Sequence, residues 1–295
     1  TENNYDSYIL TSAGSKIRDV EINGTKVLLG PVHSKNPFVI FKNIFLIISY
    51  IRKYHIKIIH VRSRAPAWSV FFVSKIIDIK CISTFHGTYN FKGFLKKLYN
   101  SIMLRMNGTI AISNFINDHI QKNYFFKKNS IQTIERGIDL NFFDPMSISK
   151  NDINNALKEY DLKKNSIKIL LPARVTEWKG HLFLVDAISQ LLKKKELNIE
   201  VLFFGTDQNK SLKEKIENFI RVKNLQNIIK FYGPTNKMNL IYALSDIVIS
   251  SSTDPEAFGR VSIEAQAMGK LIIASAHGGS QETIIEGKTG YLYSP

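Results

Sequence analysis

The sequence predicts an α/β protein that is built from two parallel-sheet domains. Short apolar runs rich in Ile and Val recur along the chain, and several of the segments between them have helical periodicity. Strands that alternate with helices form parallel sheets that helices cover on both faces. A length of 295 residues is enough for two domains, each with its own core.

The expected strands are buried runs that end at turn or loop residues. They are Tyr8–Leu10, Lys57–Val61, Lys80–Thr84, Thr109–Ile112, Ile167–Leu171, Glu200–Phe204, Ile228–Tyr232, Ile247–Ser250 and Leu271–Ala274. Helical periodicity marks Gly180–Lys193, Ser211–Lys223 and Val261–Met268. Asp144 and Pro145 interrupt regular structure, and a polar stretch follows them. We therefore expect a first domain at residues 1–145 and a second at residues 146–295.

Composition narrows the class of protein without deciding its function. Hydrophobic residues make up 44% of the chain and charged residues 22%, which is typical of a globular protein and argues against disorder. The single cysteine excludes a disulfide within the chain and fits a cytoplasmic location. The net charge of +15 suits nucleic acid, an anionic membrane or a phosphorylated substrate, and codon bias explains it equally well. The most apolar stretch, Pro37–Tyr50, is too short to span a bilayer.

The most informative motif is Glu256–Glu264, which follows a buried strand and a loop and runs into a helix. The amides of Phe258, Gly259 and Arg260 lie at the start of that helix, where free N–H groups and the helix dipole favour anions. Glycine also lets a ligand approach the backbone closely. The two carboxylates can accept hydrogen bonds from different hydroxyls of one ligand. Charged helices often produce this spacing by chance, and only the strand–loop–helix order makes it specific.

Two further loops follow expected strands of the second domain. Arg174 and Lys179 lie in Pro172–Gly180, beside the start of a helix. Two cations there suit a diphosphate, because they offset the charge that builds on a leaving group. A solvated basic loop is the alternative. Ala276–Glu282 contains two adjacent glycines that suit a tight, ligand-facing turn.

The first domain offers weaker candidates. His86 follows an expected strand and serves as a base, as an electrophile or as a hydrogen-bonding core residue. Arg62 or Arg64, after another strand, meets a phosphate or an acidic acceptor, or else forms a surface pair. Glu135–Asp139 is expected to end the last strand of this domain, where a hinge would lie.

Together these motifs resemble the retaining glycosyltransferases of the type-B fold (GT-B), in family 4, also called glycosyl transferases group 1. The residues of the motifs are most similar to those of bacterial lipopolysaccharide-type transferases, and the resemblance extends from Ile58 to Tyr293. The resemblance implies two Rossmann-like domains that face each other across a cleft. The first would be the acceptor side, and the second would bind the donor nucleotide.

Carried over by position, the resemblance implies a role for each motif. Arg174 and Lys179 would hold the donor diphosphate, and Glu264 would bind the ribose hydroxyls. Glu256 would face the transferred sugar, together with the amides at the start of the following helix (Phe258, Gly259 and Arg260). His86 would lie near the 6-position of that sugar.

The resemblance also implies a nucleotide-sugar donor, a glycan or lipid-linked acceptor, and a role in lipopolysaccharide or cell-envelope polysaccharide synthesis. Cofactors and metals are not expected, and the sequence has no Asp-x-Asp motif. The basic first domain is expected to contact anionic lipid at the inner face of the cytoplasmic membrane. Its cations include Lys42, Arg52, Lys53, Lys92, Lys96, Lys97 and Arg105. Family members start with a strand and a Gly-rich loop and end with further helices, and we expect this chain to lack both.

Two alternatives stay open. One is a catalytically inactive fragment of such an enzyme, and the other is a basic nucleic-acid-binding α/β protein. Glu256 and Glu264 argue against the second, because carboxylates repel a phosphate backbone, so we expect no nucleic-acid partner. A nicotinamide-dependent oxidoreductase would need a Gly-x-Gly-x-x-Gly turn after a strand, and the sequence has none. The nucleobase, the sugar and the acceptor are not predictable from the sequence.

Overall fold

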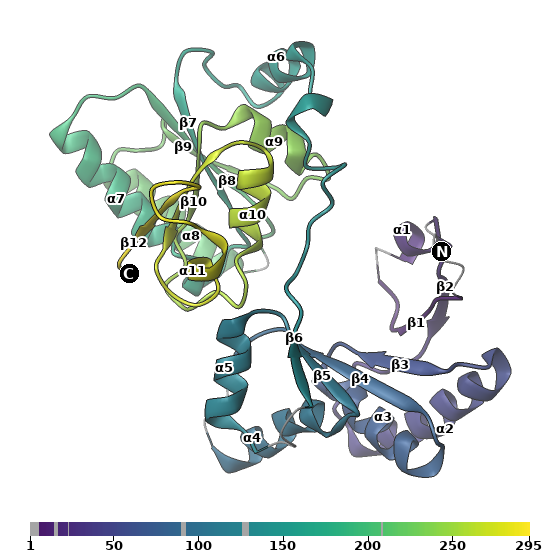
Figure 1. Ribbon diagram of the computed structural model, residues 1–295. Helices are drawn as coiled ribbons and strands as arrows, with labels where there is room; N and C mark the ends of the chain where they lie inside the picture. Colours follow the sequence, from purple (N-terminus) through teal and green to yellow (C-terminus); the bar gives the residue numbers. More distant parts are fainter. Residues whose placement is uncertain (1–5, 15–16, 23, 90–92, 126–129, 208) are drawn as a thin grey trace. The chain divides into compact units, whose positions relative to one another are not determined.

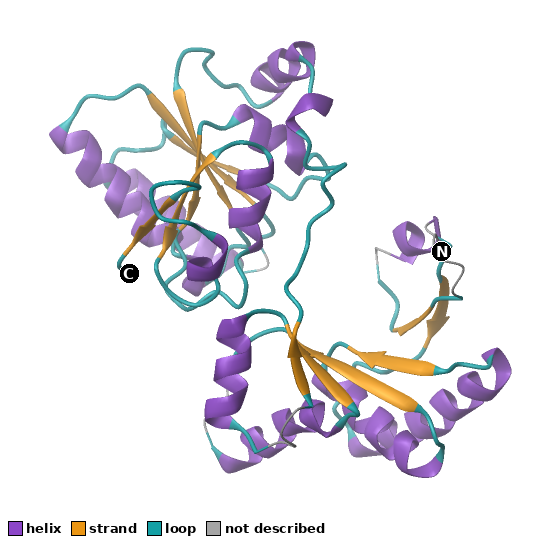
Figure 2. Ribbon diagram, in the orientation of Figure 1, coloured by secondary structure: helices purple, strands orange, loops and turns teal. Residues whose placement is uncertain are grey.

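A computed structural model describes residues 6–14, 17–22, 24–89, 93–125, 130–207 and 209–295. The chain divides into two compact units, Thr1–Ile134 and Glu135–Pro295, which we call the N-terminal and C-terminal units. Every strand pair of the described residues is parallel, which confirms the predicted α/β class (Figures 1 and 2).

The division between the units falls at Ile134, earlier in the chain than the expected boundary at residue 145. The reason is apolar packing, because Phe143 is buried in a core cluster of the C-terminal unit and Ile138 and Phe142 pack against it. The last strand of the N-terminal unit is Ile131–Thr133, so the segment Glu135–Asp139 lies beyond it.

The described strands of the N-terminal unit form two parallel sheets. One pairs β1 with β2, and the other has the order β3-β4-β5-β6. The elements of this unit are β1 (Tyr8–Thr11), α1 (Ile17–Ile22), β2 (Lys26–Leu29), α2 (Pro37–Tyr54), β3 (Ile58–Val61), α3 (Arg64–Ile76), β4 (Lys80–Phe85), α4 (Phe94–Ser101), η1 (Ile102–Arg105), β5 (Gly108–Ala111), α5 (Asn114–Asn123) and β6 (Ile131–Thr133).

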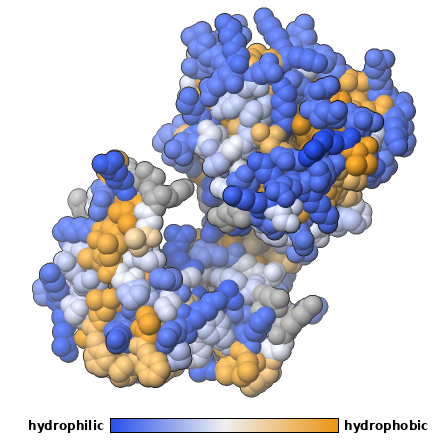
Figure 3. Space-filling model, turned by 180° about the vertical axis from the view of Figure 1, so that it is seen from behind, coloured by the Kyte–Doolittle hydropathy of each residue, from blue (hydrophilic) through white to orange (hydrophobic). Residues whose placement is uncertain are grey.

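Helix α2 covers the apolar stretch that the sequence analysis singled out. It starts with Pro37 after Asn36, whose side chain accepts a hydrogen bond from the Phe38 amide at 2.9 Å, which is a standard N-cap. Its inner face contacts α3, and among the described residues no helix is long and apolar enough to cross a membrane. The back view shows apolar side chains gathered on this unit over the region of α2 and α3 (Figure 3).

The described strands of the C-terminal unit form one sheet of the order β12-β11-β10-β7-β8-β9. Its elements are η2 (Pro145–Ser147), α6 (Lys150–Glu159), β7 (Ile167–Pro172), η3 (Glu177–Lys179), α7 (His181–Lys194), β8 (Ile199–Phe204), α8 (Lys210–Val222), β9 (Ile229–Tyr232), α9 (Met238–Leu244), β10 (Ile247–Ser250), α10 (Arg260–Ala267), β11 (Leu271–Ser275), α11 (Ser280–Thr283) and β12 (Tyr291–Tyr293).

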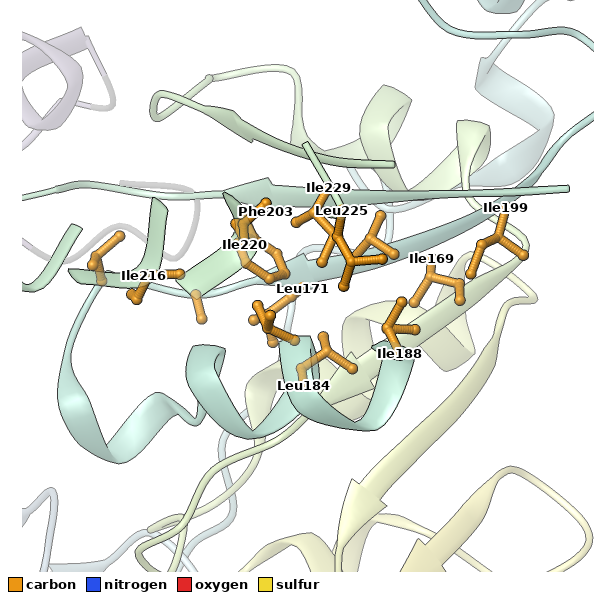
Figure 4. Close-up of a cluster of buried hydrophobic side chains, with 14 of the residues drawn as sticks. Ile169, Leu171, Leu184, Ile188, Ile199, Phe203, Ile216, Ile220, Leu225 and Ile229 are labelled. Carbon is orange, nitrogen blue, oxygen red and sulfur yellow. The ribbon is translucent and has the colours of Figure 1, made fainter. Parts of the chain in front are cut away.

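Two apolar clusters hold helices on opposite faces of this sheet. The first joins α7 and α8 to the strands, with Leu184, Ile188 and Ile216 packed near Leu171 and Phe203 (Figure 4). The second cluster packs α6, α9 and α10 on the other face. All six residues of β8 are buried, as expected for a strand that is covered on both sides.

The order of the strands creates a switch point. The unit starts with β7 in the interior of the sheet, adds β8 and β9 on one side, and then returns to add β10, β11 and β12 on the other. The chain therefore leaves the neighbouring strands β7 and β10 in opposite directions along the sheet, and the loops after these two strands separate. In open α/β sheets, ligands bind in the crevice outside the carboxyl ends of such strands.

Candidate functional site

The candidate site is built from loops that follow β7, β10 and β11, at the switch point of the C-terminal sheet. Its central contact is an ion pair between Lys179 on the first loop and Glu256 on the second, with 2.5 Å between Nζ and Oε1. The side chains are 15% and 13% exposed, so the pair is largely withdrawn from water. The Ser252 hydroxyl donates a second hydrogen bond to the same carboxylate oxygen, at 2.5 Å.

Hydrogen bonds to main-chain carbonyls fix the first loop against the second. The Ser251 hydroxyl donates to the carbonyl oxygens of Lys179 and Gly180, at 2.9 and 3.2 Å. The Thr253 amide donates to the carbonyl of Trp178 at 2.8 Å. Gly180 has a φ of +69°, and a Cβ there would collide with the Ser251 carbonyl. Only glycine fits this position, so the close approach that places Lys179 depends on it.

The third loop, after β11, packs on the backbone of Glu256. The Gly279 amide donates to the Glu256 carbonyl at 2.7 Å. A Cβ on Gly278 or Gly279 would meet the backbone of Glu256 or Phe258. A ring nitrogen of His277 lies 2.9 Å from the Ser252 carbonyl. The two glycines that the sequence assigned to a ligand-facing turn thus let this loop support the Glu256 segment.

Helix α10 starts at this junction. Gly259 occupies its N-cap with a φ of +91°, and Phe258, just before it, is buried. The first amides of a helix have no acceptor within the helix, so the end that starts with Arg260 is suited to an anion.

Glu264 lies one turn inside α10, and both of its carboxylate oxygens accept hydrogen bonds. Arg260 donates to one oxygen at 2.8 Å, and the Tyr242 hydroxyl donates to the other at 2.8 Å. Burial, followed by the charge of Glu264, raises the pKa of Tyr242 well above its usual value, so its hydroxyl stays a donor. Each oxygen of an ionised carboxylate has a second lone pair, which leaves acceptor capacity for a ligand.

Arg174 lies on the same loop as Lys179 and is exposed. Among the described residues, its guanidinium takes part in no ion pair of 4.0 Å or less. The next residue, Val175, donates its amide to the Thr206 carbonyl at 2.9 Å, which ties this loop to the end of β8. The loop therefore presents one neutralised cation and one exposed cation.

A cavity of about 50 Å³ opens at the carboxyl ends of β7, β8 and β9. Its lining includes Ala173, His181, Gly205, Phe231 and Gly233. Both ring nitrogens of His181 are buried without a hydrogen-bond partner among the described residues. Burial, and then the nearby charge of Lys179, lower the pKa of His181 to about 4, so the ring is neutral at pH 7.

The candidates of the N-terminal unit lie apart from this cluster in the chain and are described within their own unit. His86 directly follows β4, and the guanidinium of Arg62 approaches its ring at 3.5 Å. Arg64 donates to Asn100 at 2.7 Å and lies 4.3 Å from the centre of the Tyr89 ring. These contacts give Arg64 a structural role, whereas Arg62 stays exposed at the end of β3.

Sequence reasoning missed several residues that shape the site. Tyr242 lies on α9 and reaches Glu264 across 22 positions of the chain. Ser251 and Ser252, in the loop before Glu256, hold the first loop and the carboxylate. A run of serines directly after a buried strand at a switch point is a signal that would have identified the latter two.

Family models match both units. The model described as Glycosyltransferase Family 4 matches residues 1–142, and the model described as Glycosyl transferases group 1 matches residues 152–295. The predicted family membership is therefore confirmed on each half of the chain.

Solved structures and a curated relative agree with the family models. A glycosyltransferase from Rickettsia africae is 38% identical, with a TM-score of 0.90, over 100% of this chain and 77% of its own. Anabaena Alr3699/HepE, solved in complex with UDP and glucose, is 20% identical with a TM-score of 0.84 over 98% of this chain and 78% of its own, a likeness of fold.

A lipopolysaccharide 1,2-N-acetylglucosaminetransferase from Salmonella typhimurium is 29% identical over 51% of this chain, and this chain spans only 41% of that relative. Solved neighbours of the whole chain are GT-B glycosyltransferases, as the motifs predicted. The chain thus belongs to the glycosyltransferases of family 4 and group 1, which transfer sugar residues.

Proposed function

We propose that the chain transfers a sugar from a nucleotide-sugar donor to a glycan or lipid-linked acceptor, with retention of configuration at the transferred carbon. The observation that carries this proposal is the Lys179–Glu256 pair at the start of α10. A cation, a carboxylate and a helix N-terminus at one switch point are the groups that a sugar diphosphate requires.

In this proposal, the diphosphate binds between Lys179, Arg174 and the amides at the start of α10 (Phe258, Gly259 and Arg260). Lys179 exchanges Glu256 for a phosphate oxygen, and the exposed Arg174 adds a second charge. Cations aimed at a leaving group stabilise the negative charge that develops on it. They replace a metal ion here, so we expect donor binding to survive a chelator such as EDTA.

The nucleoside is proposed to occupy the neighbouring groove. Glu264 accepts from the ribose hydroxyls, because Arg260 and Tyr242 hold its two oxygens in place and leave lone pairs available. The cavity beside β8 and β9 is lined by Phe231 and two glycines, Gly205 and Gly233, together with the charged residues Asp207 and Lys213. The glycines leave room for the flat edge of a nucleobase, and the polar residues offer it hydrogen bonds. UDP in the Anabaena neighbour is consistent with a uridine donor.

The sugar is proposed to lie against the Glu256 carboxylate, which diphosphate binding frees from Lys179. The family resemblance assigns His86, which follows β4 and has Arg62 beside it, to the 6-position of that sugar. The leaving diphosphate assists attack on the same face, and no separate general base is assigned.

We propose a cell-envelope acceptor and a site of action at the inner face of the cytoplasmic membrane. The motifs that resemble lipopolysaccharide-type transferases support this acceptor class, as does the Salmonella typhimurium relative.

The test is a calorimetric titration of UDP, GDP, ADP and CMP into the folded chain. We expect one nucleotide to bind, with loss of binding in Arg174→Ala/Lys179→Ala and in Glu264→Ala. Asp186→Asn is the matched control, because it removes a partner of Lys223 from an ion pair of 2.7 Å outside the site. Absence of binding by the folded wild-type chain, checked by circular dichroism, contradicts the donor site. Transfer with inversion to a lipid-linked acceptor contradicts retention alone.

A further inference from the structure

We propose that the exposed face of α2 is a docking surface for an anionic lipid bilayer. This inference rests on the surface of the N-terminal unit alone and is independent of the proposed donor site. It assigns the membrane contact to a particular helix and to particular side chains.

The solvent-facing side of α2 carries apolar side chains that do not pack in the core of the protein. Phe38, Phe41 and Phe45 are 79%, 59% and 60% exposed, although they belong to a helix whose opposite face already packs on the protein. Their spacing of three and four residues puts them on one stripe of the helix. Three exposed phenylalanines on one stripe form an apolar patch that a water-facing helix normally avoids.

Exposed basic side chains lie on the same side of α2. Lys42 lies between the phenylalanines, and Arg52 and Lys53 occupy the last turn, all exposed. Helix α2 contains no acidic residue. At 1.5 Å per residue, the stripe from Phe38 to Arg52 is roughly 20 Å long, with its aromatic part first and its cationic part last. A helix of this kind lies along a membrane, with the aromatic rings among the acyl chains and the cations at the phosphates.

Charge over the whole unit selects an anionic partner. The N-terminal unit has 19 Lys and Arg against 6 Asp and Glu, which accounts for +13 of the chain's +15. Asp78 is the single acidic residue between Glu21 and Asp118. Helix α3, which packs on α2, adds exposed Phe72, Lys75 and Ile76. A bilayer that contains anionic lipid matches both properties, whereas nucleic acid would leave the phenylalanines in water.

The test is sedimentation of the full chain with vesicles at low salt. One set is equimolar phosphatidylglycerol and phosphatidylcholine, and the other is phosphatidylcholine alone. We expect binding to the anionic vesicles only. Phe38→Gln/Phe41→Gln/Phe45→Gln keeps the helix-forming tendency and is expected to weaken partition at least tenfold. Lys42→Glu/Arg52→Glu/Lys53→Glu is expected to weaken it at least about 100-fold, since each cation near an anionic surface contributes about fivefold.

The matched control is Lys193→Glu/Lys194→Glu/Lys195→Glu, which reverses three exposed cations at the end of α7 in the C-terminal unit. It makes the same change in net charge and is expected to sediment nearly as the wild type does. Equal loss in this control would show that net charge alone acts, and would overturn the assignment to α2. A wild-type chain that stays in the supernatant would overturn the proposal.

A second copy of the chain is the competing occupant of the patch. Sedimentation velocity without lipid distinguishes it, because a dimer that the triple Phe→Gln variant dissociates would assign the patch to self-association and overturn the membrane role. Nucleotide titration of the same variants is expected to match the wild type, so failure here is separate from failure of the donor site.

Discussion

Replacing Glu256 with Gln is expected to strengthen the binding of a nucleoside diphosphate while it weakens sugar transfer. The wild-type carboxylate binds Lys179, with 2.5 Å between Oε1 and Nζ. A diphosphate must therefore compete with a partner that is already in place. The variant keeps the shape of the side chain and its acceptor oxygen but removes the charge.

The magnitude of the gain in affinity follows from two effects that act in the same direction. A charge-assisted hydrogen bond contributes roughly 1.5–3 kcal/mol net, and most of this is lost when Lys179 turns to a phosphate. The repulsion between the carboxylate and the diphosphate is removed as well, although the exposed Arg174 screens part of it. We expect a net gain of about 1.5 kcal/mol, or about tenfold in affinity for UDP. Transfer is expected to fall about 100-fold, the usual scale for losing one group aimed at the reacting centre.

Calorimetry with UDP measures the first effect, and release of UDP from a UDP-sugar measures the second. Lys179→Met is expected to weaken UDP binding at least tenfold, because a cation at the diphosphate is lost. Asp186→Asn is again the control, since its partner Lys223 is the C-cap residue that follows α8, outside the site. Equal or weaker UDP affinity in a folded Glu256→Gln variant would refute competition between the carboxylate and the donor.

Three further predictions concern residues that support the site. The folded-state pKa of His181, about 4, lies below the ordinary value of 6.5, so the free energy of unfolding decreases as the pH falls below 6.5. In urea unfolding, the wild type should lose about 2 kcal/mol more of this free energy between pH 7 and pH 5 than His181→Met does. An equal loss in the two proteins would contradict a buried neutral ring. Gly180→Ala should destabilise by about 3 kcal/mol or more, because the new Cβ meets the Ser251 carbonyl, whereas Gly269→Ala, at a similar φ of +64° with open space, should cost about 1–2 kcal/mol in the same assay. Tyr242→Phe should weaken nucleotide binding about tenfold without loss of helicity, through the hydrogen bond of 2.8 Å that holds Glu264, and unchanged affinity would remove this positioning role.

Sequence patterns located the elements of the C-terminal unit well, because its strands are buried on both faces. The expected strand Ile247–Ser250 matches β10, and the expected helix Gly180–Lys193 differs from α7 by one residue at each end. Continuous apolar runs bounded by polar loops leave few other interpretations. β6 and β12, with three residues each, are too short to stand out in the same way.

The side-chain pairs that join different loops of the site could not be predicted from the sequence. The resemblance assigned Lys179 and Glu256 to different parts of the donor, and the structure pairs them with one another. Arg64 was a candidate for binding a phosphate or an acidic acceptor, or for a surface pair, and the structure shows that its guanidinium donates to buried Asn100. Such contacts depend on which loops the sheet order brings together, and short-range periodicity carries no information about that order.

The distance along the chain between the two halves of the site has a consequence for how the protein forms. Lys179 and Glu256 are 77 positions apart, on opposite sides of the switch point. Contacts between distant positions carry a large loop-closure entropy and tend to form late in folding. A chain that has assembled only β7, β8 and β9 therefore holds an unpaired Lys179 and no donor site. Nucleotide binding then reports completed folding of the unit. A nucleotide that is present during refolding binds only the completed unit and shifts the folding equilibrium toward it by mass action.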